Sequence, residues 1–356
     1  MLFRSFGPET NFMMTTGNHD YYNEFASIPA FREALGDEYF ANDVDFTDFE
    51  NGSRHCVVKG YNFIFVEPID YRNYCEYEES TLTWLDAKLA AITAENPDKY
   101  VFVFTHPPVY GTAYGSEVEG AMWTTKNLGP TLAKYPQVLM FAGHSHFPIN
   151  DERSIMQTEF TSVGCGAVRY VSLDGTLANG GDPKNVYDVS TGHLVQVDAD
   201  GNVRITRMNF SNGTTIKTPW VLSAPMESKN HLTKYRSERA SENSAPVLTG
   251  TVTFTPTAET ATTADGTITV PAAIDDDMVH HYIIDVVNVE TGATAQTMKV
   301  LSDFAFYSKV SEMSDTLRHN ISLSDAGQYR IDITAVDSWG AKSNKLSCTY
   351  TVGGSN

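Results

Sequence analysis

Three short stretches of the chain carry side chains that could bind a metal ion and transfer a proton. The first is Gly17-Asn18-His19-Asp20, which follows the apolar residues 12–14. Its amide oxygen can bind a hard metal ion, its imidazole can exchange a proton near neutral pH, and its carboxylate can orient that imidazole. Taken alone, the stretch could equally be an ordinary polar turn, because Gly and Asn are frequent in turns.

The other two stretches place histidines directly after apolar runs. The run at residues 100–105 leads into His106, and the run at residues 137–142 leads into residues 143–146, which read Gly-His-Ser-His. Such runs predict buried strands, and the carboxyl ends of parallel strands gather functional groups at one edge of an α/β sheet. A single histidine there could be an ordinary surface residue, but three such loops together predict one site.

The spacing of apolar residues predicts the helix and the strands that position these loops. Residues 81–94 have apolar side chains three and four positions apart, with Ser80 as a candidate N-cap, which predicts an amphipathic helix. Residues 54–58 and 61–66 predict two strands. The second of these strands, the helix and the strand at residues 100–105 form a strand-helix-strand unit of the right-handed parallel kind.

The ordered set of a GNHD loop, a His-bearing strand end and a GHxH loop resembles the calcineurin-like metallophosphoesterase family over about residues 12–210. The resemblance implies an α/β (α+β) fold, in which two sheets form a sandwich flanked by helices. It also implies a binuclear hydrolase of phosphate monoesters or diesters that uses two divalent ions, Mn, Fe or Zn. The implied partner is a small phosphate-ester substrate, attacked by a metal-bound hydroxide.

The resemblance also implies a role for individual residues. The implied metal ligands are Asn18, His106, His144 and His146, of which the first three hold one ion and the last helps to hold the other. His19 is the implied general acid, which protonates or stabilises the leaving oxygen. Asp20 would orient the His19 imidazole.

The aspartates of the family's metal site have no counterpart in this sequence. In the family, a DxH loop and a GDxxD loop precede the GNHD loop, and one of their aspartates bridges both ions. Residues 1–16 contain neither motif, and Glu9 is the sole acid among them. We therefore expect an N-terminally truncated fold from a longer enzyme, and a chain that alone binds one metal ion or none. A catalytically impaired remnant and a surface interaction protein stay open as alternatives.

After residue 245 the pattern changes to short strand-like runs without helical periodicity, one of them at residues 303–307, which predicts an all-β sandwich. Residues 325–333 resemble the entry to strand F of immunoglobulin-like and fibronectin-like domains, with Tyr329 as a candidate tyrosine corner. A packing and spacing role is favoured for this module over a carbohydrate-binding or adhesive role. The expected organisation is a partial metallophosphoesterase domain at residues 1–215, a linker at residues 216–245 and the sandwich at residues 246–356.

The composition of the chain limits which classes of molecule it can bind. With 356 residues the chain has room for two domains, and its formal net charge of −19 opposes binding to nucleic acid or an anionic membrane. No apolar run is long enough to span a membrane, and the first residues lack the apolar core of a signal peptide. The four cysteines match no zinc or redox motif. The acidic composition and the added sandwich favour a bacterial protein that is secreted or lies at the cell surface.

Overall fold

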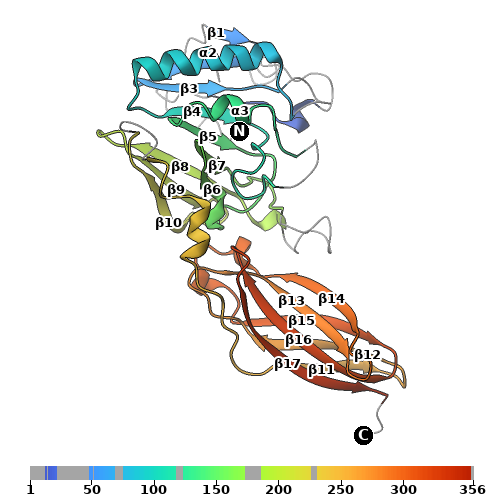
Figure 1. The fold of residues 1–356 in the computed structure, drawn as a ribbon. Helices are drawn as coiled ribbons and strands as arrows, with labels where there is room; N and C mark the ends of the chain where they lie inside the picture. Colours follow the sequence, from blue (N-terminus) through green and yellow to red (C-terminus); the bar gives the residue numbers. More distant parts are fainter. Residues whose placement is uncertain are drawn as a thin grey trace. The chain divides into compact units, whose positions relative to one another are not determined.

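The computed structural model describes residues 13, 15–21, 48–50, 52–68, 75–117, 123–172, 186–225 and 231–353, and the structural statements below refer to these residues. The chain divides into two compact units. The first unit is formed by residues 1–174 and 189–237, and the second by residues 175–188 and 238–356 (Figure 1).

A seven-stranded sheet with the order β1-β2-β3-β4-β5-β7-β6 forms the centre of the first unit. Its strands are β1 (Asp48–Glu50), β2 (Ser53–Val58), β3 (Tyr61–Phe65), β4 (Val101–Thr105), β5 (Val138–Ala142), β6 (Ile155–Gln157) and β7 (Thr161–Gly164). The pairs β3 with β4, β4 with β5 and β5 with β7 are parallel, whereas β1, β2 and β6 join antiparallel. The predicted strands are confirmed, and the carboxyl ends of β3, β4 and β5 are therefore neighbours at one edge of the sheet.

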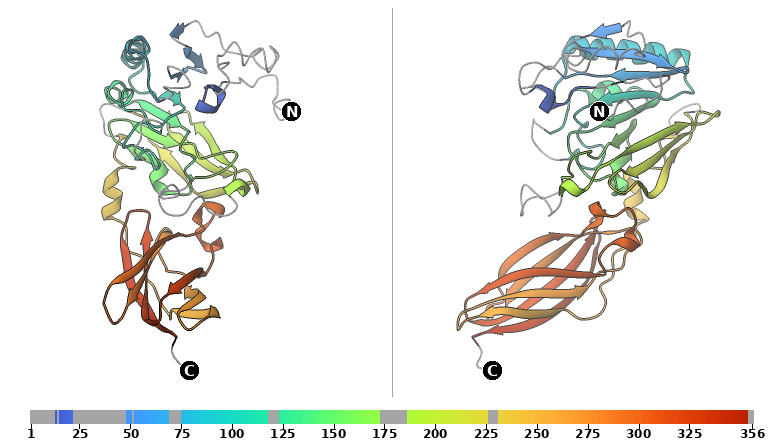
Figure 2. Two further views of the ribbon diagram at one scale, coloured as in Figure 1. Left: turned by 90° about the vertical axis from the view of Figure 1, so that its right-hand side faces the viewer. Right: turned by 180° about the vertical axis from the view of Figure 1, so that it is seen from behind.

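Two helices cover one face of this sheet (Figure 2). α2 (Glu79–Glu95) confirms the predicted amphipathic helix, and α3 (Gly129–Leu132) is a single turn. Leu85 and Leu89 of α2 pack in one buried cluster with Val103 of β4. Ser80 is not the N-cap, because the helix begins one residue earlier and its N-cap is Glu78, whose side chain makes no capping hydrogen bond.

A second, antiparallel sheet packs against the opposite face. It contains β8 (Thr191–Val197), β9 (Val203–Asn209) and β10 (Thr214–Leu222) in the order β10-β9-β8. Its Ile205 and Trp220 share a buried cluster with Phe102 of β4 and Phe141 of β5. The first unit is therefore a layer of helices, a mixed sheet and an antiparallel sheet, in which a hairpin joins β8 to β9.

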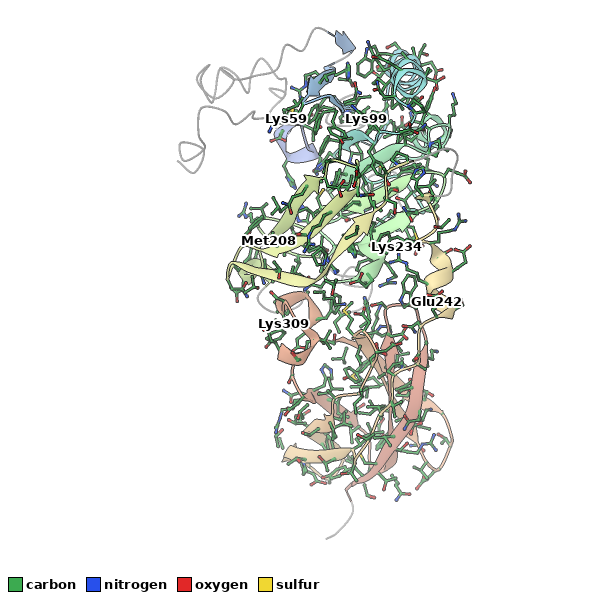
Figure 3. All side chains as sticks on the ribbon, turned by 90° about the vertical axis from the view of Figure 1, so that its left-hand side faces the viewer. Lys59, Lys99, Met208, Lys234, Glu242 and Lys309 are labelled. Carbon is green, nitrogen blue, oxygen red and sulfur yellow. The ribbon has the colours of Figure 1, made fainter. Side chains whose placement is uncertain are left out.

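The expected linker at residues 216–245 is wrong for its first part, because β10 extends to Leu222. Beyond β10, Tyr235 is buried, and the side-chain oxygen of Gln157 accepts hydrogen bonds from the backbone N–H groups of Lys234 (3.0 Å) and Tyr235 (2.8 Å). Lys234 is labelled in Figure 3, and its Nζ also donates to the backbone oxygen of Val221. The sequence did not predict this docking. Backbone groups and isolated apolar side chains form its contacts, and no periodic apolar run marks them.

The second unit is a sandwich of two antiparallel sheets, as predicted. One sheet contains β11 (Thr253–Glu259), β12 (Thr263–Pro271) and β15 (Thr316–Ser324), and the other contains β13 (Val279–Asn288), β14 (Thr294–Leu301), β16 (Gly327–Asp337) and β17 (Lys342–Val352). The hydroxyl of buried Tyr329 lies 3.0 Å from the backbone oxygen of Ser324, which confirms the tyrosine corner. The strand expected at residues 303–307 is wrong, since Phe304–Phe306 is a 3-10 turn with Phe304 buried. No helix in the described parts of the chain is long and apolar enough to cross a membrane.

Candidate metal-binding site

Three of the predicted ligands meet at the carboxyl edge of the central sheet. His106 directly follows β4, and its Nε2 lies 2.8 Å from Oδ1 of Asn18 and 3.0 Å from Nδ1 of His144. The His106 and His144 rings are 4.7 Å apart between centroids. The three side chains come from three separate loops, so the fold assembles this cluster from residues that are distant in the sequence.

The loop that carries Asn18 approaches His106 through a glycine. A Cβ atom at Gly17 would lie 2.8 Å from Cε1 and 3.0 Å from Nδ1 of His106, which is closer than real Cβ contacts come. Residues Asn18–Tyr21 form a 3-10 turn, η2, directly after this glycine. Asp20 closes the turn, because its carboxylate accepts a hydrogen bond from the Gly17 N–H at 2.7 Å. Its expected role in orienting the His19 imidazole remains a prediction.

The loop after β5 has unusual backbone conformations. His144 and His146 have φ angles of 65° and 56°, in the left-handed region that costs non-glycine residues on the order of 1–3 kcal/mol each. The N–H of Gly143 donates to the backbone oxygen of His106 at 2.9 Å and thereby joins this loop to the end of β4. Backbone strain of this kind concentrates at functional sites, which makes these two histidines candidates for a role beyond packing.

His146 lies at the margin of the cluster. Its Nδ1 is 3.2 Å from the backbone oxygen of Tyr170, and its ring lies 4.3 Å from the ring of that residue. It is nevertheless close enough to His106 to affect the electrostatics of that imidazole. His19 is exposed on η2 and acts on His106 in the same way. Ligation by His146 and proton transfer by His19 remain predictions.

Burial keeps the central imidazole neutral. The loss of hydration, followed by the effect of charge on His144, His146 and His19, lowers the pKa of His106 to about 3. At neutral pH the imidazole therefore carries no positive charge and retains a lone pair. A neutral imidazole is the form that binds metal ions.

The distances in the cluster suit a shared metal ion. Nitrogen and oxygen ligands lie about 2.0–2.2 Å from such an ion, so two ligands at right angles are about 3 Å apart. The contacts of His106 with Asn18 and His144 have this separation. In the described parts of the chain, however, no group of three or more His, Cys, Asp or Glu side chains could hold a metal ion. The cluster therefore offers three neutral side chains, of which two are histidines.

Two aromatic residues contact the cluster in ways that the sequence did not predict. The Trp123 ring stacks on His144, with centroids 5.2 Å apart and planes at 30°. The acidic composition of residues 70–79 predicts a solvated loop or a rim of the site, but Tyr77 is buried, and its hydroxyl hydrogen-bonds the hydroxyl of Thr105 beside His106. The sequence did not predict the burial of Tyr77, because its acidic neighbours are typical of a solvated loop.

Glu67 is the acidic residue at this edge of the sheet that sequence reasoning missed. It lies two residues after β3, which is parallel to and paired with β4. Its carboxylate is buried and accepts a hydrogen bond from the backbone N–H of Thr16 at 3.0 Å. The signal was available, because Glu67 follows a buried strand as His106 and His144 do, but a lone acid matches no motif.

Comparison with known proteins gives a family match within the first unit and several structural matches with low TM-scores. A family model described as calcineurin-like phosphoesterase matches residues 1–148. A search of curated proteins returned no match. Among solved structures, a fibronectin type III domain of human collagen α-1(XX) is 19% identical, with a TM-score of 0.21, over 32% of this chain and 89% of that chain. The FN5 domain of Drosophila Lar is also 19% identical, with a TM-score of 0.19, over 32% of this chain and 99% of that chain.

Proposed function

We propose that this chain takes part in metal-dependent hydrolysis of phosphate esters. The observation that carries the proposal is the meeting of Asn18 with His106 and His144, which follow the parallel strands β4 and β5, through contacts of 2.8 and 3.0 Å. The match of residues 1–148 to calcineurin-like phosphoesterases supports the same activity. A small phosphate ester is the proposed substrate, and a secreted or cell-surface location is the proposed setting.

In this proposal each residue of the cluster has its own role. Asn18, His106 and His144 would hold one divalent ion in this chain, and in a two-ion site His146 would help to hold the second. A bound ion would supply positive charge that stabilises the phosphoryl oxygens and lowers the pKa of a coordinated water. Gly17 lets Asn18 reach His106, and the pKa of about 3 keeps the His106 imidazole neutral, so that one of its two nitrogens has a lone pair. His19, exposed on η2, would donate a proton to the leaving oxygen.

The proposal is tested by hydrolysis assays on the purified chain. Nitrophenyl phosphate and bis(nitrophenyl) phosphate would be offered with Mn²⁺ or Zn²⁺, and again after treatment with a chelator. We expect release of nitrophenol that needs the metal and is lost in His106→Ala. Release that persists unchanged in His106→Ala, or no release under any of these conditions, would contradict the proposal.

A second candidate function is metal binding with little or no turnover. One observation favours it: among the residues that the structure describes, no carboxylate joins the three neutral ligands as part of a metal-binding group. Two divalent ions a few ångströms apart repel each other strongly unless anionic ligands offset their charge. In this case the chain would retain one ion and show no metal-dependent release of nitrophenol.

A further inference from the structure

A buried ion pair lies immediately beneath the loop that carries Asn18. Glu67 and Arg54 are only 4% and 3% exposed, and Nη2 of Arg54 lies 3.5 Å from Oε1 of Glu67. The Arg54 guanidinium also lies over the Phe65 ring, 5.4 Å from its centroid. The backbone N–H of Glu67 donates to Oγ of Ser53 at 2.9 Å. β2 therefore binds Glu67 twice, through Arg54 at its carboxylate and through Ser53 at its backbone.

The same carboxylate holds the start of the site loop. The backbone N–H of Thr16 lies 3.0 Å from Oε2 and 3.3 Å from Oε1 of Glu67, and the Thr16 hydroxyl donates to Oε2. Thr16 is itself 2% exposed. The next residue is Gly17, whose backbone lies against the His106 ring, and after it comes Asn18, which contacts His106. One buried carboxylate thus connects the central sheet to the loop, two residues before a predicted ligand.

Stability alone is a weak reason for such an arrangement. Burial raises the pKa of Glu67, although the Thr16 hydrogen bonds and the charge of Arg54 oppose the rise. Replacing a buried ion pair by apolar side chains is often neutral or stabilising, because desolvating the charges costs much of what their attraction supplies. What an apolar pair could not supply is an acceptor for both the N–H and the hydroxyl of Thr16.

We propose that Glu67 is a positioning residue for the metal site. It fixes the backbone at Thr16, so that Gly17 packs on His106 and the oxygen of Asn18 reaches His106 Nε2. This inference rests on the proposed function, because it concerns the same ligands. A carboxylate suits the task better than an amide, since it only accepts hydrogen bonds, and the groups of Thr16 and Arg54 beside it are donors.

Glu67→Gln tests the proposal, because it keeps the size of the side chain and removes the charge. The matched control is Asp332→Asn in the second unit, where Asp332 is 2% exposed and pairs with Arg330 and Lys345. The first readout needs no metal: the nuclear Overhauser contact between Gly17 Hα and the His106 Hε1 proton. The second is the affinity for Zn²⁺ measured by calorimetry.

We expect Glu67→Gln to weaken the Gly17–His106 contact and to lower the Zn²⁺ affinity by roughly tenfold, the scale found when partners of metal ligands are lost. Asp332→Asn should change neither readout, even where it lowers the melting temperature. Thr16→Val, which removes the hydroxyl and keeps the N–H, should cause a smaller loss in the same direction and serves if Glu67→Gln does not fold.

An unchanged contact and unchanged affinity in a folded Glu67→Gln or Thr16→Val protein would overturn the positioning role. Equal losses in Asp332→Asn would also overturn it, because they would show a general effect of removing buried charge. If the wild-type chain bound no metal ion, the proposed function would fail. The Gly17–His106 contact would then still decide whether Glu67 positions the loop.

Discussion

The imidazole of His106 lies against the backbone of Gly17, so closely that a Cβ atom at that glycine would stand 2.8 Å from Cε1. The contact joins the loop after β4 to the loop that carries Asn18 and His19. The distance of 2.8 Å between Asn18 Oδ1 and His106 Nε2 depends on it. The geometry of the site therefore depends on the lack of a side chain at Gly17 as well as on the predicted ligands.

Gly17→Ala should disrupt the site. The added methyl group must displace the His106 ring or the loop, so we expect the Zn²⁺ affinity to fall by about tenfold or more. Gly143→Ala is the matched control, because a Cβ there would lie at an ordinary 3.7 Å from His106 Nδ1. Calorimetric titration of both variants checks this, and equal affinities in the two would show that the close approach is unimportant.

The strand ends could be predicted from the sequence because each buried strand is a compact apolar run followed by a polar loop. The apolar runs before His106 and His144 predicted both strands. They also predicted the edge of the sheet at which the two histidine side chains meet. The meeting of Asn18 with His106 was expected from the three His-bearing loops after apolar runs and from the family resemblance, but the described residues before Gly17 form no strand. Glu67 was missed because its role depends on a backbone N–H that is 51 residues away.

The docked segment after β10 could not be predicted for a similar reason. Gln157 Oε1 accepts from the N–H groups of Lys234 and Tyr235, and its Nε2 donates to the backbone oxygen of His231. None of these contacts has a periodic signature. In the second unit, the alternating pattern and Tyr329 were enough to predict the sandwich. The apolar Phe304 suggested a strand where the chain forms a 3-10 turn.

Gln157→Ala should destabilise the first unit. It leaves the N–H groups of Lys234 and Tyr235 without their acceptor, at a cost of about 1–3 kcal/mol in the free energy of unfolding. Gln196→Ala, at an exposed position on β8, should change that free energy by no more than ~0.5 kcal/mol. Chemical denaturation of both variants gives the comparison. A similar small change in both would mean that the segment is not docked through Gln157.

His19→Ala should separate proton transfer from metal binding. In the proposed mechanism His19 is not a ligand, so its loss should leave the metal content unchanged. Turnover of an alkyl phosphate should slow by roughly 10²- to 10⁴-fold, because its poor leaving group needs protonation. Nitrophenyl phosphate, with a good leaving group, should be affected less. Loss of the metal from His19→Ala, or an equal effect on both esters, would remove His19 from the role of general acid.

The account depends most on the claim that Asn18, His106 and His144 form the site of one divalent ion. The direct test is a calorimetric titration of the metal-free chain with Zn²⁺. The matched control for His106→Ala is His55→Ala, because His55 makes the same 2.8 Å contact with an asparagine, Asn62, on neighbouring strands of the sheet.

In that titration we predict one ion per wild-type chain, an unchanged affinity in His55→Ala, and a loss of about tenfold or more in His106→Ala. Binding that is equally strong in His106→Ala and the wild type, or no binding to the wild type at all, would contradict the central claim.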